Sequence, residues 1–219
     1  MYFQFLIEDR SGKVLVEKIM DKLCEVNNNV IYECKYFHGI GGFTKKNTVK
    51  ETKTGKLLND LATYLKGFDK SLRYMPDGAA VFVVLDNDTR ETELFRNELE
   101  QVAETNSISI DHVFCIAVEE MEAWLLGDEA AIKTAYPNAK LNHLKNYEQD
   151  SICGTWEILA EIVYEGGMKK FAKECPTFVE AGKIKSEWAE EIGKHLDLDS
   201  NKSPSFQFFI KEIRKRLSA

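Results

Sequence analysis

The chain has 219 residues, of which 44% are hydrophobic and 30% are charged, and its formal net charge is −7. This composition is ordinary for a globular protein and excludes the disordered and fibrous classes. The negative charge argues against a protein that coats nucleic acid by overall attraction, although a local basic patch can still guide a substrate to an acidic metal site.

The first part of the chain alternates predicted strands with predicted helices. Strands are predicted where apolar residues run continuously or alternate with polar ones, at residues 2–7, 30–37, 80–85 and 113–118. Amphipathic helices are predicted between them at residues 13–23, from Leu57 to Leu65, and at 91–104. This alternation is typical of an α/β fold with a mainly parallel sheet flanked by helices.

Beyond the last predicted strand, the pattern indicates helices alone. They are expected at residues 119–126, 128–136, 155–164, 183–195 and 204–217. Ser203 is the expected N-cap of the last helix and Pro204 its first residue. We therefore predict an α/β domain over residues 1–126 and an α-helical extension over residues 127–219, which either packs on the sheet or forms a lid.

Acidic residues follow three of the predicted strands at the point where each strand ends. Glu8 follows the first strand, Asp86 and Asp88 follow the third, and Glu119 and Glu120 follow the fourth. Because ligands of open parallel sheets bind at the carboxyl ends of the strands, these acids are expected to converge on one edge. Asp86 and Asp88 are two residues apart, so an extended backbone would point both the same way.

Clustered carboxylates repel one another unless a cation neutralises them. Oxygen ligands without a nearby Cys or His favour Mg²⁺, Mn²⁺ or Ca²⁺ over zinc. The alternative is that the acids are ordinary turn residues or helix caps, with Asp88 capping a helix near Arg90 and Asp9 or Ser11 capping one from Lys13. Three acidic strand ends in one small sheet favour the metal site.

The five cysteines are scattered and include no Cys-x-x-Cys pair, which predicts reduced thiols rather than a zinc or redox site. The apolar opening segment is too short for a signal peptide and has no basic flank. No apolar run reaches the length of a membrane span. These features predict a soluble, cytoplasmic protein.

Four segments carry a resemblance to a known family: FLIEDRSGK (5–13), HGIGG (38–42), VVLDND (83–88) and EEMEAWLLGD (119–128). A glutamate after the first strand and an Asp-x-Asp after a later one resemble the TOPRIM fold of primases, topoisomerases and overcoming-lysogenization-defect (OLD) nucleases. Together the segments more closely resemble an uncharacterised TOPRIM-like family. That family includes AbiL-type and RloB-type phage-defence proteins, which are often encoded beside ABC-type ATPases.

The resemblance implies a metal-dependent nuclease or a related phosphoryl-transfer enzyme, with Mg²⁺ or Mn²⁺ as the cofactor. By this resemblance Glu8, Asp86 and Asp88 would be the catalytic residues and metal ligands, and Glu120 and Glu122 would serve a second metal. Nucleic acid and an ABC-type ATPase would be the partners, in phage defence.

One feature departs from the TOPRIM pattern. A glycine usually follows the glutamate directly, whereas Asp9, Arg10 and Ser11 here precede Gly12. This departure and the negative net charge leave a second function open, that of a non-catalytic binding or regulatory subunit on a TOPRIM-like scaffold.

Three basic residues are candidates for binding the substrate. Lys45 and Lys46 lie in the lysine-rich segment 44–56, and Arg90 follows the Asp-x-Asp. The alternatives are a mobile solvated loop for the lysines and a pair with Glu93 for Arg90. No tyrosine is singled out as a nucleophile, so hydrolysis is the expected reaction.

Overall fold

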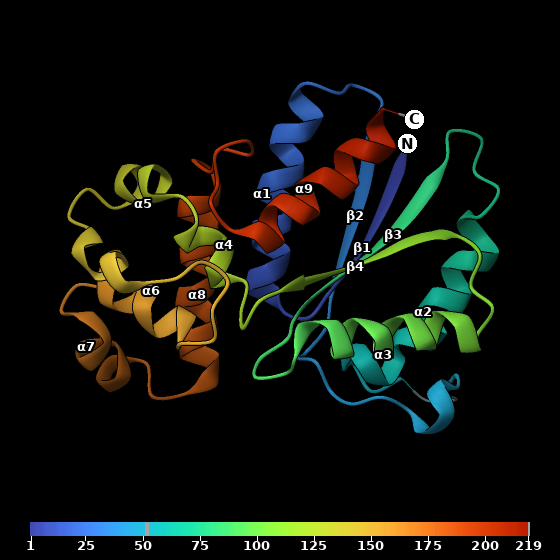
Figure 1. Cartoon of the computed structure of the whole chain (residues 1–219), viewed down its shortest axis with the longest axis horizontal. Coiled ribbons are helices and arrows are strands. Elements are labelled where there is room, and N and C mark those ends of the chain that lie inside the picture. The colour runs from blue at the N-terminus through green and yellow to red at the C-terminus, as the bar shows by residue number, and fades with distance from the viewer. Residues whose placement is uncertain (51–52, 219) are drawn as a thin grey trace.

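The computed structural model describes residues 1–50 and 53–218. At its centre lies a parallel sheet whose spatial order is β2-β1-β3-β4. Its strands are β1 (Tyr2–Ile7), β2 (Ile31–Tyr36), β3 (Ala79–Asp86) and β4 (Asp111–Ala117). The predicted α/β fold class is confirmed (Figure 1). Each predicted strand agrees with an observed one to within two residues at either end.

Helices cover both faces of the sheet. These are α1 (Arg10–Glu25), α2 (Leu57–Leu72), α3 (Thr92–Thr105) and α9 (Pro204–Leu217). Successive strand residues point to opposite faces, so Phe82 and Val84 of β3 pack on the side of α1 and α9, whereas Val83 and Leu85 pack on the side of α2 and α3. Burial on both faces explains the unbroken apolar runs that predicted the central strands.

The remaining helices gather at the carboxyl ends of the strands, to the left of the sheet in Figure 1. They are α4 (Glu122–Leu126), α5 (Glu129–Ala135), α6 (Thr155–Val163), α7 (Gly167–Glu174) and α8 (Phe178–Gly193). Two 3-10 turns, η1 (Lys45–Asn47) and η2 (Leu141–Asn146), complete the described elements. None of the described helices is long and apolar enough to cross a membrane.

Helix α9 returns from this group to the sheet, so part of the predicted extension packs on the α/β core. Phe209 is fully buried, and its ring centroid lies 6.1 Å from that of Phe5 and 6.0 Å from that of Phe82. Arg216 pairs with Asp111 at the start of β4, with Nε 2.6 Å from Oδ2. Ser203 caps α9 and Pro204 is its first residue, as predicted.

Among the described residues, one α-helix, α7, was not predicted from the sequence pattern, and α8 begins five residues earlier than predicted. Thr177 and Glu180 form a capping box in which the Thr177 side chain accepts from the Glu180 amide and the Glu180 side chain accepts from the Thr177 amide. The Thr-x-x-Glu spacing was the sequence signal for this start.

Asp69 ties the last turns of α2 to the segment before β4. Its Oδ1 accepts hydrogen bonds from the amides of Ser109 at 2.9 Å and Ile110 at 2.7 Å, and Arg73 binds its other oxygen. Burial raises the pKa of Asp69, but the hydrogen bonds from Arg73, Ser109 and Ile110 outweigh it and lower the pKa to about 2.

We expect Asp69→Asn to lower the free energy of unfolding at pH 7 by about 1–2 kcal/mol, because the ionised carboxylate is the better acceptor. Since the folded pKa lies below the unfolded value, this stability is present above about pH 4 and is lost as the pH falls toward 2. Urea denaturation of both proteins at pH 7 and pH 3 measures the difference. Asp77→Asn, at an exposed site, is the control. A difference that stays constant with pH would contradict the assignment.

Candidate functional site

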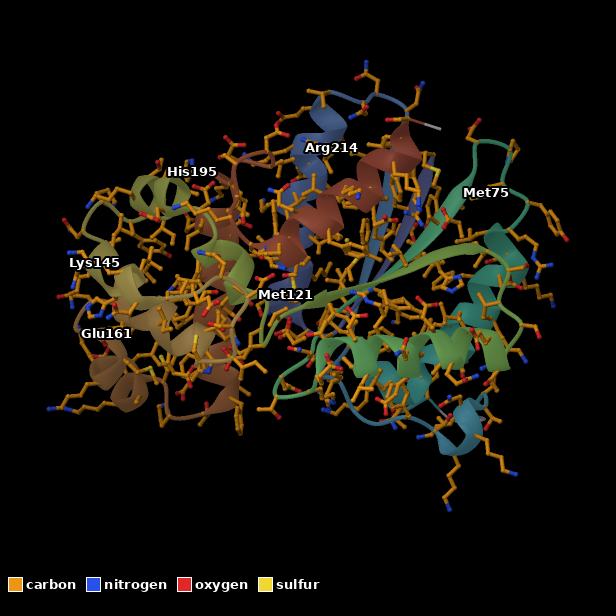
Figure 2. The ribbon with its side chains drawn as sticks, viewed as in Figure 1. Met75, Met121, Lys145, Glu161, His195 and Arg214 are labelled. Atoms are coloured by element: carbon orange, nitrogen blue, oxygen red, sulfur yellow. The ribbon has the colours of Figure 1, made fainter. Side chains whose placement is uncertain are left out.

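The parallel sheet brings the predicted strand-end acids to one edge. Asp86 is the last residue of β3, and its amide donates a hydrogen bond to Oε2 of Glu8, which follows β1, at 3.1 Å. Glu120 and Glu122 follow β4 and flank Met121, which Figure 2 places where the sheet meets the group of helices α4 to α8. We call Glu8, Asp86, Glu120 and Glu122 the carboxyl-edge cluster.

Burial and mutual repulsion perturb the first two members of this cluster. Burial raises the pKa of Glu8 to about 7, and the neighbouring charges of Asp88 and Asp9 add to the effect, although the Asp86 amide opposes it. Burial and the charges of Glu8 and Glu122 raise the pKa of Asp86 well above its ordinary value. Oδ1 of Asp86 is buried and accepts no hydrogen bond from the described residues.

Lys185 of α8 reaches into the other half of the cluster. Its Nζ lies 3.2 Å from Oε2 of Glu122 and 3.6 Å from Oε2 of Glu120. The longer distance exceeds a hydrogen bond, so the buried Glu120 Oε2 has no hydrogen-bond partner among the described residues. Burial raises the pKa of Glu120 to about 8 and also raises that of Glu122, although Lys185 opposes both shifts.

The same ion pairs hold Lys185 in its charged form. Burial lowers the pKa of Lys185, but the carboxylates of Glu122 and Glu120 outweigh it and raise the pKa above its ordinary value. Its Nζ also lies 5.9 Å from the ring centroid of Trp156. No motif singles out Lys185 in the sequence, because one lysine on an amphipathic helix looks like any solvated lysine. Only the packing of α8 against the sheet edge reveals it.

Asp88 does not point the same way as Asp86, so the prediction of an extended backbone was wrong here. The strand ends at Asp86, and the Asp88 amide donates to the carbonyl of Glu119, which turns the chain and gives Asp88 a φ of 51°. The Asp88 side chain is half-exposed and accepts a hydrogen bond from Nη1 of Arg90 at 2.7 Å. Arg90 therefore pairs with Asp88 and not with Glu93.

The helix after this loop begins later than the Asp88 cap proposed from the sequence would place it. Glu91 is the N-cap of α3, and its side chain accepts from the amides of Glu93 and Leu94, so Asp88 is not a helix cap. Asp88 instead lines a small pocket of about 210 Å³. The pocket is lined by Asp88, Thr89, Glu119, Glu120, Gly154, Trp156 and Glu157.

Two other acids at this edge have structural roles. Asp9 is the N-cap of α1, and its Oδ1 accepts from the Gly12 amide at 2.7 Å, as the cap interpretation predicted. Gly12 has no room for a side chain, because a Cβ there would lie 2.9 Å from Ile7 Cγ2. Glu119, with a φ of 62°, accepts from the Thr155 amide at 2.7 Å and so holds the start of α6.

Lys45 and Lys46 lie far from the carboxyl-edge cluster. They belong to η1, and the carbonyl of the adjacent Asn47 accepts a hydrogen bond from Asn106, which ends α3. The opposite end of α3 adjoins the cluster. Its first residue, Thr92, accepts a hydrogen bond at Oγ1 from the side chain of Asn87, which directly follows Asp86. The 14 residues of α3 span about 20 Å. Figure 1 accordingly shows the blue segment between β2 and α2 at the far end of α3.

The cluster fits a hard divalent cation in its chemistry, because its donors are carboxylate oxygens, two of which are buried and accept no hydrogen bond from the residues that the structure describes. The described residues nevertheless contain no group of three or more His, Cys, Asp or Glu that could hold a metal ion as they stand. A third ligand beside Glu8 and Asp86 therefore requires a side-chain movement. Asp88 is the candidate for this movement, because its exposed pair with Arg90 contributes about 1 kcal/mol or less and so opposes its release only weakly.

Comparison with protein-family models, with curated proteins and with solved structures gives no match. Function is therefore inferred from the side chains at the carboxyl edge.

Proposed function

We propose that the carboxyl-edge cluster binds Mg²⁺ or Mn²⁺ and that the protein hydrolyses phosphodiester bonds of nucleic acid. The observation that carries this proposal is the buried Oδ1 of Asp86 beside Glu8, which accepts no hydrogen bond within the described part of the chain. A buried carboxylate without a partner is costly, and a bound cation would remove that cost. The TOPRIM resemblance supports the same interpretation of these two residues.

Asp86 and Glu8 would hold the ion, and Asp88 would join them after separating from Arg90. When bound, the ion would lower the pKa of a coordinated water and offset negative charge on the phosphate. Arg90, released from Asp88, would then be free to bind a phosphate oxygen. Lys185 already places a positive charge beside Glu120 and Glu122, which favours one ion over the two that the resemblance implies.

The test is calorimetric titration of Mg²⁺ and Mn²⁺ into the purified protein and into an Asp86→Ala/Asp88→Ala variant. We expect wild-type binding and a loss of metal affinity of about 100-fold in the variant, since losing even an outer-shell partner of a metal site costs about 10- to 100-fold. Mn²⁺-dependent cleavage of DNA and RNA should be lost as well. Asp77→Ala, at an exposed site away from the cluster, should bind like the wild type.

Three outcomes separate the competing assignments. Absence of metal binding in the wild type would refute the proposal and favour the non-catalytic binding or regulatory subunit. Metal binding that survives in the double variant would place the ion elsewhere. Metal binding without cleavage of any nucleic acid would retain the site but reject hydrolysis.

We further propose a cytoplasmic location and an ABC-type ATPase partner in phage defence. The partner and the setting rest on the family resemblance, and the location is supported by five free cysteines. Co-expression with an ATPase encoded beside the gene, followed by co-purification, tests the partner. Separate elution of the two proteins would count against it.

A further inference from the structure

Strand β2 forms an open edge of the sheet. It comes first in the spatial order β2-β1-β3-β4, and among the described residues no strand pairs with its outer side. The other strands are mostly buried, whereas four of the six residues of β2 are exposed, namely Ile31, Glu33, Lys35 and Tyr36. β2 contains no proline and its register with β1 is unbroken, so it lacks two common devices that keep an edge strand from pairing.

Alternate residues of β2 turn their backbone groups away from the sheet. The amides of Ile31 and Phe37 donate to carbonyls in the first seven residues of the chain, at 3.1 Å and 2.9 Å. Since successive residues of an extended strand face opposite ways, Tyr32, Cys34 and Tyr36 direct their amides and carbonyls outward. No described residue from another part of the chain forms a hydrogen bond with these outward groups. They can therefore pair with a further strand.

The charges of β2 complement those of a second copy of the same strand. In an antiparallel pair centred on Cys34, Glu33 of each copy lies opposite Lys35 of the other. Sliding one strand by two residues either way keeps the hydrogen bonding but sets Glu33 against Glu33, or Lys35 against Lys35. Opposite charges across a strand pair are stabilising and like charges are destabilising. The charge order of the strand therefore selects the register centred on Cys34.

The same register brings the apolar and aromatic residues of the two strands together. Tyr32 of one copy lies opposite Tyr36 of the other, an aromatic pair across the strands. Ile31, which is 64% exposed, lies opposite Phe37 and is partly covered by it. A lysine on an edge strand ordinarily discourages pairing, but in this register Lys35 meets a carboxylate.

We propose that two copies of the chain associate through antiparallel pairing of β2 in this register, which joins their sheets into one. A second copy is favoured over an unrelated extended segment because the strand itself supplies the complement to its own charges. This inference goes beyond the proposed function and does not depend on it. Because the paired strands run in opposite directions, the two carboxyl-edge clusters lie at opposite ends of the joined sheet.

Sedimentation equilibrium of the full chain measures this association. We expect a dimer with a Kd of about 10–100 µM, because a strand edge alone is a small interface. Lys35→Glu and Glu33→Lys each set like charges opposite one another and should weaken association about tenfold. The Glu33→Lys/Lys35→Glu variant exchanges the two charges, restores opposite pairs in this register, and should associate like the wild type.

The backbone pairing has a test of its own. Cys34→Pro removes the outward amide at the centre of the pair, at an edge position that tolerates proline, and should abolish association. Glu98→Lys on α3 and Lys45→Glu in η1 reverse exposed charges away from β2 and should associate like the wild type. Circular dichroism checks that each variant is folded.

A wild-type chain that stays monomeric at concentrations well above the expected Kd would overturn the inference, and would leave the edge to an extended segment of another protein. A dimer that Lys35→Glu and Cys34→Pro leave unchanged would overturn it as well, by placing the interface elsewhere. Failure of the exchanged variant to associate would reject the register. Lys35→Glu should bind Mg²⁺ and Mn²⁺ like the wild type in the calorimetric test, so this inference and the proposed function fail separately.

Discussion

Lys185→Met should lower the free energy of unfolding at pH 8 by about 3–5 kcal/mol, the usual effect of removing one partner of a buried ion pair. The Glu122 side chain is only 4% exposed and Lys185 is 3.2 Å away, so the substitution leaves a buried carboxylate without its counterion. Without Lys185 the folded-state pKa values of Glu122 and Glu120 rise further above the unfolded value, which favours the protonated forms. The penalty is therefore small near pH 5 and grows as the pH rises.

Urea denaturation in EDTA at pH 5 and pH 8 measures this effect, and a Glu122→Gln/Lys185→Met variant provides the matched comparison. Removing both charges should recover part of the stability, because position 122 then carries no unpaired charge, whereas Glu120 still lacks Lys185. Lys183→Met, two residues away on the same helix but exposed, should change stability little. A loss that is equal at both pH values and unchanged by Glu122→Gln would show that Lys185 acts through packing.

The second large effect is expected at Phe209, where α9 packs on the sheet. Phe209→Ala should lower the free energy of unfolding by about 3–5 kcal/mol, the usual range for truncating a buried phenylalanine. Its ring lies 4.9 Å from that of Trp124 and also contacts Phe5 and Phe82, so truncation leaves a cavity among aromatic rings. Urea denaturation followed by circular dichroism measures the change.

Phe208→Ala is the matched control, because it truncates the neighbouring phenylalanine on the half-buried side of the same helix. The guanidinium of Arg96 lies 5.0 Å from the Phe208 ring centroid, an interaction that contributes about 1 kcal/mol. We therefore expect the smaller loss at Phe208. Equal losses at the two positions would contradict the docking of α9 through Phe209.

The positions of the strands and their parallel orientation could be predicted, because both follow from hydrophobic patterns within short segments of the sequence. The run from Ala80 to Leu85 is apolar without interruption, which is typical of a strand covered on both faces, and Tyr2–Ile7 was predicted to the residue. Parallel strands share their carboxyl edge, so the gathering of Glu8 and Asp86 at that edge could be predicted, whereas their direct contact depends on the observed strand order, which places β1 beside β3.

The orientation of individual side chains could not be predicted in the same way. Asp88 turns away from Asp86 because its amide bonds to the carbonyl of Glu119, a residue 31 positions later in the chain. The role of Glu119 in holding the start of α6 likewise depends on Thr155, far away in sequence. Hydrogen bonds between residues so far apart produce no periodic pattern in the sequence from which they could be predicted.

The sequence by itself determined the α/β class, the parallel sheet and the edge at which acids gather, since hydrophobic periodicity and strand-end residues are properties of short segments. Only the tertiary structure decided which acids meet and what neutralises them. It brought Lys185 from α8 to Glu120 and Glu122, carried α9 back to the sheet, and placed Lys45 and Lys46 at the far end of α3. The physical reason is that a buried charge is stabilised by whatever group the packing of distant helices places beside it.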